Sequence, residues 1–246
     1  MLLKDQLPHS GSWLFRWRSY LPVLFLGFLA TQFADYSHPL DSERADLALE
    51  AGCLLVGFLG LAIRAHVVGH SPGRTSGRNT KTQIADVLNT TGLYSLTRNP
   101  LYVGNLLMWI GAAMFFHDMT VVLITISAFW LYYERIVAAE ESYLESHFGS
   151  AYTDWAARTP VFLPKLTGYV RPELAFSWRT VLRREYSGMF GLVSTLFVLE
   201  VLGDVASEGT WHIEPLWAAL MGMATVVYMT LKLTKRRTTW LDAMGR

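Results

Sequence analysis

Six apolar stretches alternate with polar segments along this chain of 246 residues. They cover 20–34, 47–63, 101–116, 119–133, 188–202 and 215–233. Several are shorter than the roughly 20 residues that a helix needs to cross the hydrocarbon layer, but flanking Trp, Tyr and Arg side chains can extend a helix into the interface. The pattern predicts an all-α integral membrane protein with about six transmembrane helices.

Only His117 and Asp118 separate the third stretch from the fourth. Two polar residues are too few for a domain and suit a tight turn between antiparallel helices. We therefore predict a helical hairpin over 101–133.

The composition agrees with membrane spans, because 52% of the residues are hydrophobic and only 17% are charged. A soluble chain usually carries about 25% charged residues. The single cysteine, Cys53, excludes a disulfide framework and a cysteine-based zinc site. A net charge of +1 gives no indication of nucleic acid, and we predict no such partner.

The basic residues predict the orientation of the spans. With both termini in the cytoplasm, all of the 21 Lys and Arg residues except Arg44 fall in inner segments, whereas the outer loops are acidic. This distribution follows the positive-inside bias, and an odd number of spans does not produce it. A bacterial inner membrane and an endoplasmic reticulum both suit this topology.

Two inner segments, 64–100 and 134–186, are too long to be turns. The second begins as a helical continuation of the fourth span and ends in a basic, aromatic stretch, 176–186, that we expect to lie in the membrane interface. Aqueous chemistry is expected on this cytoplasmic side, because the outer loops are short.

Residues 98–102 place polar groups at the start of the third span. Pro100 suits the first turn of a helix, and Asn99 is then the N-cap residue. Arg98 and Tyr102 follow one turn apart, near a helix N-terminus that favours negative charge. A snorkelling arginine beside an aromatic interface belt is the simpler alternative.

Glu140 and Glu141 are adjacent on the continuation of the fourth span. Neighbouring helical residues diverge by about 100°, so both carboxylates cannot face one ligand atom. One can bind a cationic group while the other pairs nearby, and a solvated acidic face is the alternative.

Four further residues are weaker candidates. His66 and His70 have a spacing that suits metal ligands, but no third ligand is evident, so we interpret them as an interfacial pair and predict no metal site. Glu50 and Glu200 lie within apolar spans, where a carboxyl group is a functional candidate by default. We expect them to snorkel or to pair helices near the outer surface.

Together these motifs resemble the isoprenylcysteine carboxyl methyltransferase and phospholipid methyltransferase superfamily. The family pattern is a Gly-x-Tyr, then Arg-His-Pro-x-Tyr-x-Gly, a helical hairpin, Glu-Glu, Leu-x-x-x-Phe-Gly-x-x-Tyr and an aromatic-proline end. The matching residues are Gly92, Tyr94, Arg98, Asn99, Pro100, Tyr102, Gly104, Glu140, Glu141, Leu144, Phe148, Gly149, Tyr152, Phe162, Leu163 and Pro164. The resemblance covers 79–165, about a third of the chain.

The resemblance implies a methyltransferase core at 79–165, between a two-helix membrane region (1–78) and an interfacial segment with two helices (166–246). It implies S-adenosyl-L-methionine bound from the cytoplasm without a Rossmann domain. The implied donor-site residues are Val87, Leu88, Tyr94, Asn99, Pro100, Leu101, Tyr102 and Glu140. The candidate catalytic residues are Arg98, Arg135 and Glu141. Asn99 replaces the family histidine and cannot titrate, and Arg135 aligns only approximately with the substrate arginine of prenylcysteine enzymes.

The chemistry of the donor agrees with this implication. Glu140 can pair with its ammonium group, Arg98 or Asn99 can hold its carboxylate, and a tyrosine face can stabilise its sulfonium by cation–π attraction. Transfer is an in-line displacement, so catalysis is mostly positioning of two bound partners.

The acceptor is expected to be a membrane lipid or a prenylated molecule at the bilayer surface. Arg98 and Arg135 favour an anionic or zwitterionic headgroup, and carboxylate, phosphate and amine acceptors all stay open. NADPH-dependent membrane sterol reductases carry a similar Arg-Asn/His-Pro-x-Tyr string, but the Glu-Glu to Phe-Gly continuation favours a methyltransferase. A scaffold or transporter would instead place polar residues at the bilayer midplane.

Overall fold

The computed structural model describes residues 3–18, 20, 25, 27, 31, 43–73, 75, 84–211, 213–243 and 245. Over these residues the chain is all-α, with one short 3-10 helix and an isolated bridge between Gly92 and Val170. The α-helices are α1 (Leu3–Trp17), α3 (Glu43–His70), α4 (Pro100–Met114), α5 (Met119–Phe148), α6 (Ser150–Ala156), α7 (Trp178–Glu208) and α8 (Pro215–Arg237). The all-α part of the predicted fold class is confirmed for the described residues.

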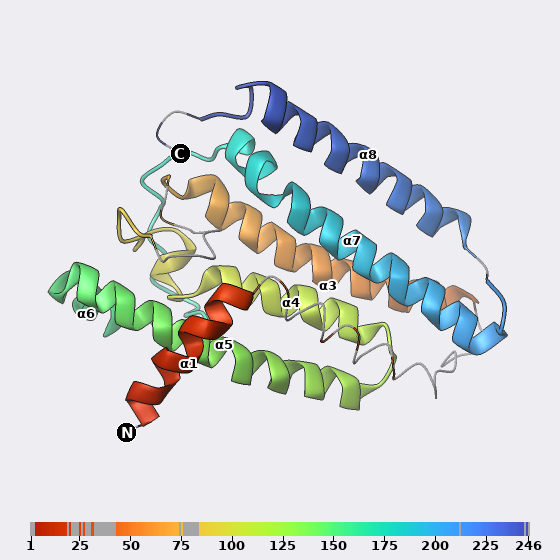
Figure 1. Cartoon of the computed structure of the whole chain (residues 1–246), viewed down its shortest axis with the longest axis horizontal. Coiled ribbons are helices and arrows are strands. Elements are labelled where there is room, and N and C mark those ends of the chain that lie inside the picture. Colours follow the sequence, from red (N-terminus) through yellow and green to blue (C-terminus); the bar gives the residue numbers. More distant parts are fainter. Residues whose placement is uncertain are drawn as a thin grey trace.

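The long helices lie side by side (Figure 1). Helix α7 packs between α8 and α3, α4 packs between α3 and α5, and α1 crosses α5. The end of α3, the start of α4, the end of α5 and the start of α7 meet at one end of the bundle, together with α6. The described parts of the two long polar segments therefore lie at that end.

Four described helices are long and apolar enough to cross a membrane: Leu47–His70, Met119–Phe148, Trp178–Ser207 and Pro215–Arg237. Helix α4 is apolar but has 15 residues, or about 22 Å at 1.5 Å per residue, which is less than a bilayer core. Five of the six predicted stretches coincide with α3, α4, α5, α7 and α8. The remaining stretch, 20–34, is the first along the chain and lies largely outside the described residues. The orientation of the helices in the membrane stays a prediction.

The predicted hairpin between α4 and α5 is confirmed. Helix α4 ends at Met114 and α5 begins at Met119. The Asp118 side chain caps α5 by accepting a hydrogen bond from the Thr120 N–H at 2.7 Å. His117 takes a positive φ of 53°, a backbone conformation that reverses the chain and that few residues other than glycine adopt.

Glycines allow α3 and α4 to approach backbone to backbone. A Cβ atom added to Gly60 would overlap the Gly104 carbonyl oxygen, and one added to Gly111 would lie 2.8 Å from the Cys53 carbonyl oxygen. Small residues at such positions are how membrane helices pack tightly. This crossing fixes the start of α4 against the end of α3.

Gly60→Ala is therefore expected to destabilise the protein by roughly 1–3 kcal/mol, because the new methyl group meets backbone atoms that cannot rotate away. Gly52→Ala is the matched control, since Gly52 lies in the same helix and a Cβ there meets nothing within 4 Å. Thermal unfolding in one detergent compares the two variants. A Gly60→Ala midpoint at or above that of Gly52→Ala would contradict the close crossing.

Candidate functional site

The segment before α4 is held in place by the segment that follows α6. The Arg98 N–H donates to the Pro160 carbonyl at 2.9 Å, and the Lys165 N–H donates to the Leu96 carbonyl at 3.0 Å. The buried Thr97 hydroxyl donates to the Phe162 carbonyl at 2.9 Å. The aromatic-proline end of the motif pattern thus fixes the backbone that presents Arg98.

Asn99 stands at the N-cap position of α4, and the buried Pro100 begins the helix, as predicted. The Asn99 side chain does not cap the helix. Its amide instead donates to the Val161 carbonyl at 2.9 Å. Leu101 follows Pro100 in the first turn and is half-buried.

Glu140 and Tyr102 meet, as the sequence predicts. The Tyr102 hydroxyl donates to Glu140 Oε1 at 2.8 Å, which joins the first turn of α4 to the second half of α5. The same oxygen lies 3.4 Å from an Nη1 atom of Arg18, just after α1. Arg18 stands 122 positions before Glu140, and sequence reasoning treated it only as an inner-loop cation.

Glu141 faces a different partner. Its Oε1 atom lies 3.1 Å from an Nη1 atom of Arg98. Burial, and then the charge of Glu141, raise the pKa of Tyr152 in α6 to about 12, so this neighbouring phenol stays protonated at neutral pH. The acidic doublet therefore divides between two arginines, as the angle between adjacent helical side chains requires.

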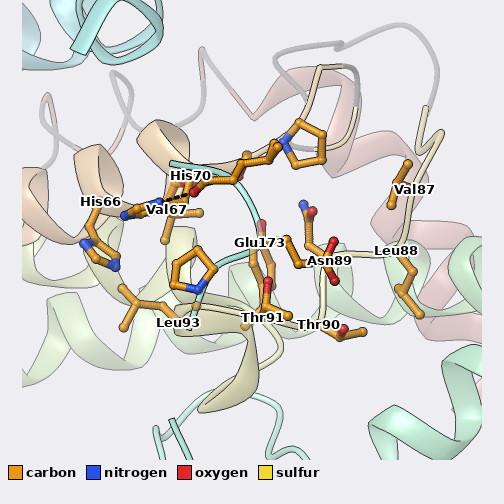
Figure 2. A pocket seen from close by; sticks show the side chains of 16 residues that line it. His66, Val67, His70, Val87, Leu88, Asn89, Thr90, Thr91, Leu93 and Glu173 are labelled. Carbon is orange, nitrogen blue, oxygen red and sulfur yellow. Dashed lines mark hydrogen bonds between the residues drawn. The ribbon is translucent and has the colours of Figure 1, made fainter. Parts of the chain in front are cut away.

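A cavity of about 210 Å³ is lined by three of the predicted donor-site residues, Val87, Leu88 and Tyr94, but not by Tyr102 or Glu140. Its wall comes from the end of α3, from 87–94 and from 172–174. Figure 2 shows His66 and His70 on one side of the cavity, with Val87 and Leu88 on the opposite side. The volume is below the roughly 300 Å³ at which small-molecule pockets begin, so it suits a part of a nucleoside-sized ligand.

Tyr94 is one of the predicted donor-site residues in the cavity wall. Burial, followed by the charge of Glu140, raises the pKa of the Tyr94 phenol above its ordinary value. The charge of Arg184 and a hydrogen bond with Asn89 act in the opposite direction. The phenol stays protonated at neutral pH, so it can donate a hydrogen bond but cannot act as a base.

The two histidines form contacts within the protein. Their ring centroids are 4.7 Å apart, and His70 Nδ1 lies 2.8 Å from the Leu174 carbonyl oxygen. His66 Nε2 lies 3.4 Å from the Tyr169 hydroxyl. Both rings therefore connect α3 to the segment before α7 while they line the cavity.

Arg135 stands apart from the Glu140 cluster. Its Nη1 atom donates to the Leu131 carbonyl one turn earlier in α5, at 2.6 Å. Of the predicted catalytic residues, Arg98 and Glu141 thus form an ion pair, whereas the Arg135 side chain bonds to the backbone of its own helix, α5. A substrate role for Arg135 stays a prediction.

A buried polar network supports the cluster from behind. The Arg64 guanidinium donates to both Glu185 carboxylate oxygens at 2.9 Å, and also to Asn105 Oδ1 at 2.6 Å. Asn105 in turn donates to the Tyr133 hydroxyl at 3.0 Å. The ring centroids of Tyr133 and Tyr102 are 4.5 Å apart, so the network joins α7, α3, α4 and α5 next to Tyr102.

Glu50 and Glu200 lie together, well away from Glu140. Carboxylate oxygens of Glu50, Glu200 and Glu214 lie within 4.8 Å of one another. The Trp217 indole donates to Glu50 Oε2 at 3.2 Å and so joins α8 to α3. This contact agrees with the expectation that these carboxyl groups pair helices.

Comparison with known proteins identifies the segment that carries the motifs. Residues 77–151 match the family model described as "Phospholipid methyltransferase". Over this segment, less than a third of its length, the chain is similar to the phospholipid methyltransferase family. The resemblance drawn from the motifs is thereby confirmed, and the matched segment contains the hairpin, Tyr102 and both residues of the acidic doublet.

Three curated relatives extend beyond the phospholipid methyltransferase segment. The "Cobalt-zinc-cadmium resistance protein CzcN" of Cupriavidus metallidurans is 37% identical over 38% of this chain and 41% of its own length. The "Nickel-cobalt-cadmium resistance protein NccN" of Alcaligenes xylosoxydans xylosoxydans is 32% identical over 51% of this chain and 56% of its own length. The "Protein-S-isoprenylcysteine O-methyltransferase" of Saccharomyces cerevisiae is 30% identical over 58% of this chain and 59% of its own length.

The chain thus spans between two fifths and three fifths of the length of these relatives. No solved structure gives a significant match. The similarity to the family model lies within 77–151, and α1, α7 and α8 lie outside it.

Sequence reasoning missed three residues that the structure places at or behind the phospholipid methyltransferase motifs. Asn105 had a visible signal, because a carboxamide within an apolar span is uncommon and points to a partner. Glu185 and Arg18 had no such signal. Each is a single charge in a basic interfacial segment, and only the packing of α7 and α1 against the family segment reveals its partner.

Proposed function

We propose that this protein is an integral membrane S-adenosyl-L-methionine-dependent methyltransferase. It would methylate a carboxylate, phosphate or amine of a lipid or prenylated acceptor at the cytoplasmic interface. The observation that carries the proposal is the hydrogen bond between Tyr102 and Glu140, and a cavity lined by Val87, Leu88 and Tyr94 supports it. The family segment supports the reaction class, and its yeast relative is a methyltransferase by name.

The residues at this site fit the donor chemically. Val87 and Leu88 offer apolar contacts for a purine base in the cavity, and Asn89 and Tyr94 offer polar groups beside them. Glu140 offers a carboxylate for an ammonium group, held in place by Tyr102. When bound, S-adenosylmethionine supplies a methyl group on a positively charged sulfur, and aromatic faces such as that of Tyr102 stabilise that charge.

The chain's own contribution is mainly positioning. The ion pair of Arg98 with Glu141 fixes the residues just before α4. The hydrogen bond from the Asn99 amide to the Val161 carbonyl fixes the same residues against the segment that follows α6. Tyr94 and Tyr152 stay protonated at neutral pH and therefore do not serve as bases. An acceptor that is already nucleophilic, such as a carboxylate or phosphate, best suits a site of this kind.

Transfer of a labelled methyl group tests the proposal. Purified protein in vesicles of the host's lipids is incubated with methyl-labelled S-adenosylmethionine, and organic extracts are examined by scintillation and mass spectrometry. The expected result is a labelled lipid heavier by one CH₂ unit. Absence of any labelled lipid or prenylated product, together with NADPH consumption on a sterol substrate, would favour the reductase alternative.

The two relatives with metal-resistance names have no reaction in their names. The same labelling experiment is therefore run with lipids from cells grown with and without cobalt, zinc or cadmium. A product that forms only from lipids of metal-stressed cells would connect methyl transfer to resistance. A product that forms equally from both would identify a constitutive acceptor.

A further inference from the structure

We propose that Arg18 binds the carboxylate of the donor's amino acid group, so that Arg18 and Glu140 together recognise this zwitterion. The proposal rests on the proposed function, because it concerns the same donor site. It assigns a binding role to α1, which lies outside the family segment 77–151.

The packing of α1 holds Arg18 at the site. Gly11 lies directly against the Arg135 carbonyl, and a Cβ atom there would also lie 3.0 Å from Ala139 Cβ. Phe15 is buried, and the Arg18 guanidinium carbon lies 4.0 Å from the centre of its ring. Because one face of the guanidinium is fixed on this ring, its charge is held beside Glu140.

The contact between Arg18 and Glu140 is long for a charge pair. Its 3.4 Å separation is longer than the 2.7–2.9 Å of a typical charge-assisted hydrogen bond. The Tyr102 hydroxyl, at 2.8 Å, is the contact that fixes Glu140 Oε1. The Glu140 side chain keeps 26% of its surface exposed and that of Arg18 keeps 14%, so neither side chain is fully buried.

The two charges match an α-amino acid. Its ammonium and carboxylate are attached to one carbon, so a site that binds both needs an anion and a cation side by side. Glu140 supplies the anion, and Arg18 supplies a planar cation that suits a carboxylate. An arginine beside a glutamate therefore satisfies both ends of the ligand at once.

The two groups first considered for the donor carboxylate have other partners. The Arg98 guanidinium lies against Glu141, 3.1 Å away, and the Asn99 amide donates to the Val161 carbonyl. Both belong to the framework that fixes the start of α4. Arg18 is the guanidinium that the structure places against Glu140 itself.

Three ligands separate the carboxylate from the rest of the donor. S-adenosylhomocysteine carries both charges, its decarboxylated analogue keeps only the ammonium, and 5′-methylthioadenosine has neither. Affinities are measured by displacement of labelled S-adenosylhomocysteine from the full-length protein in detergent. Arg18→Gln is compared with Arg16→Gln, an exposed arginine in the last turn of α1.

Arg18→Gln is expected to weaken S-adenosylhomocysteine binding by about 10- to 100-fold, the loss of one hydrogen-bonded charge pair. The affinities for the two ligands without a carboxylate should change by less than about twofold. Arg16→Gln should leave all three affinities unchanged. Arg18→Lys keeps the positive charge but loses the planar guanidinium with its paired N–H donors. It should give an intermediate loss of affinity, for S-adenosylhomocysteine alone.

Two outcomes would overturn the proposal. An equal loss for all three ligands, in Arg18→Gln or in Arg18→Lys if the first variant does not fold, would mean that Arg18 only supports the fold. Tighter binding of S-adenosylhomocysteine to Arg18→Gln would mean that Arg18 competes with the donor's ammonium for Glu140. Failure of the wild-type protein to bind any of the three ligands would instead contradict the proposed function.

Discussion

Glu140→Gln is expected to weaken S-adenosylhomocysteine binding by about 100-fold, or roughly 2.7 kcal/mol. The substitution keeps an oxygen that accepts the Tyr102 hydrogen bond, so it removes the charge and leaves the contact between α4 and α5. A partly buried carboxylate that loses its charge loses the ion pair with the ligand's ammonium. Displacement of labelled S-adenosylhomocysteine measures the change.

The matched control for this prediction is Glu134→Gln. Glu134 lies in the same helix, is exposed, and carries the same charge, so its replacement changes the net charge equally. Its affinity should stay within about twofold of wild type. Equal affinities for both variants would contradict a direct role of Glu140 in donor binding.

Arg64→Met is expected to lower the free energy of unfolding by about 3–5 kcal/mol, because it leaves the Glu185 carboxylate buried without its cation. Glu185 is only 5% exposed and receives two hydrogen bonds from Arg64. Methionine keeps an apolar stem of similar length, so the main loss is electrostatic. Unfolding in mixed micelles of increasing denaturant content measures it.

The double variant Arg64→Met, Glu185→Gln tests the cause of that loss. Replacing the Glu185 carboxylate as well should restore most of the stability. Replacing both members of a buried ion pair costs far less than removing one member and leaving the other charge buried. Arg236→Met, an exposed arginine near the end of α8, is the control and should change little. A double variant less stable than Arg64→Met would contradict the ion-pair explanation.

The apolar pattern was sufficient to predict most of the described bundle. Long apolar runs and the polar turn at His117 and Asp118 depend on local sequence, and the structure has α3, α4, α5, α7 and α8 where the runs occur. The continuation of α5 past its apolar residues was predicted, but α7 extends beyond its apolar stretch at both ends. The extensions of α7 carry polar and charged residues, for which hydropathy alone gives no signal.

The site was predictable only in part. The order of motifs predicts that Tyr102 and Glu140 lie close together, because Tyr102 lies in the first turn of one helix of the hairpin and Glu140 lies near the end of the other. The pairing of Arg98 with Glu141, and of Arg18 with Glu140, depends on tertiary packing between segments far apart in sequence. The side-chain direction of Asn99 likewise depends on the 160–162 backbone, which no local pattern specifies.

Calorimetric titration of S-adenosylhomocysteine into the purified wild-type protein, with NADPH titrated into a parallel sample, distinguishes a methyltransferase from a reductase. We expect saturable binding of one S-adenosylhomocysteine per chain and no binding of NADPH. Binding of NADPH without binding of S-adenosylhomocysteine would contradict the proposed function.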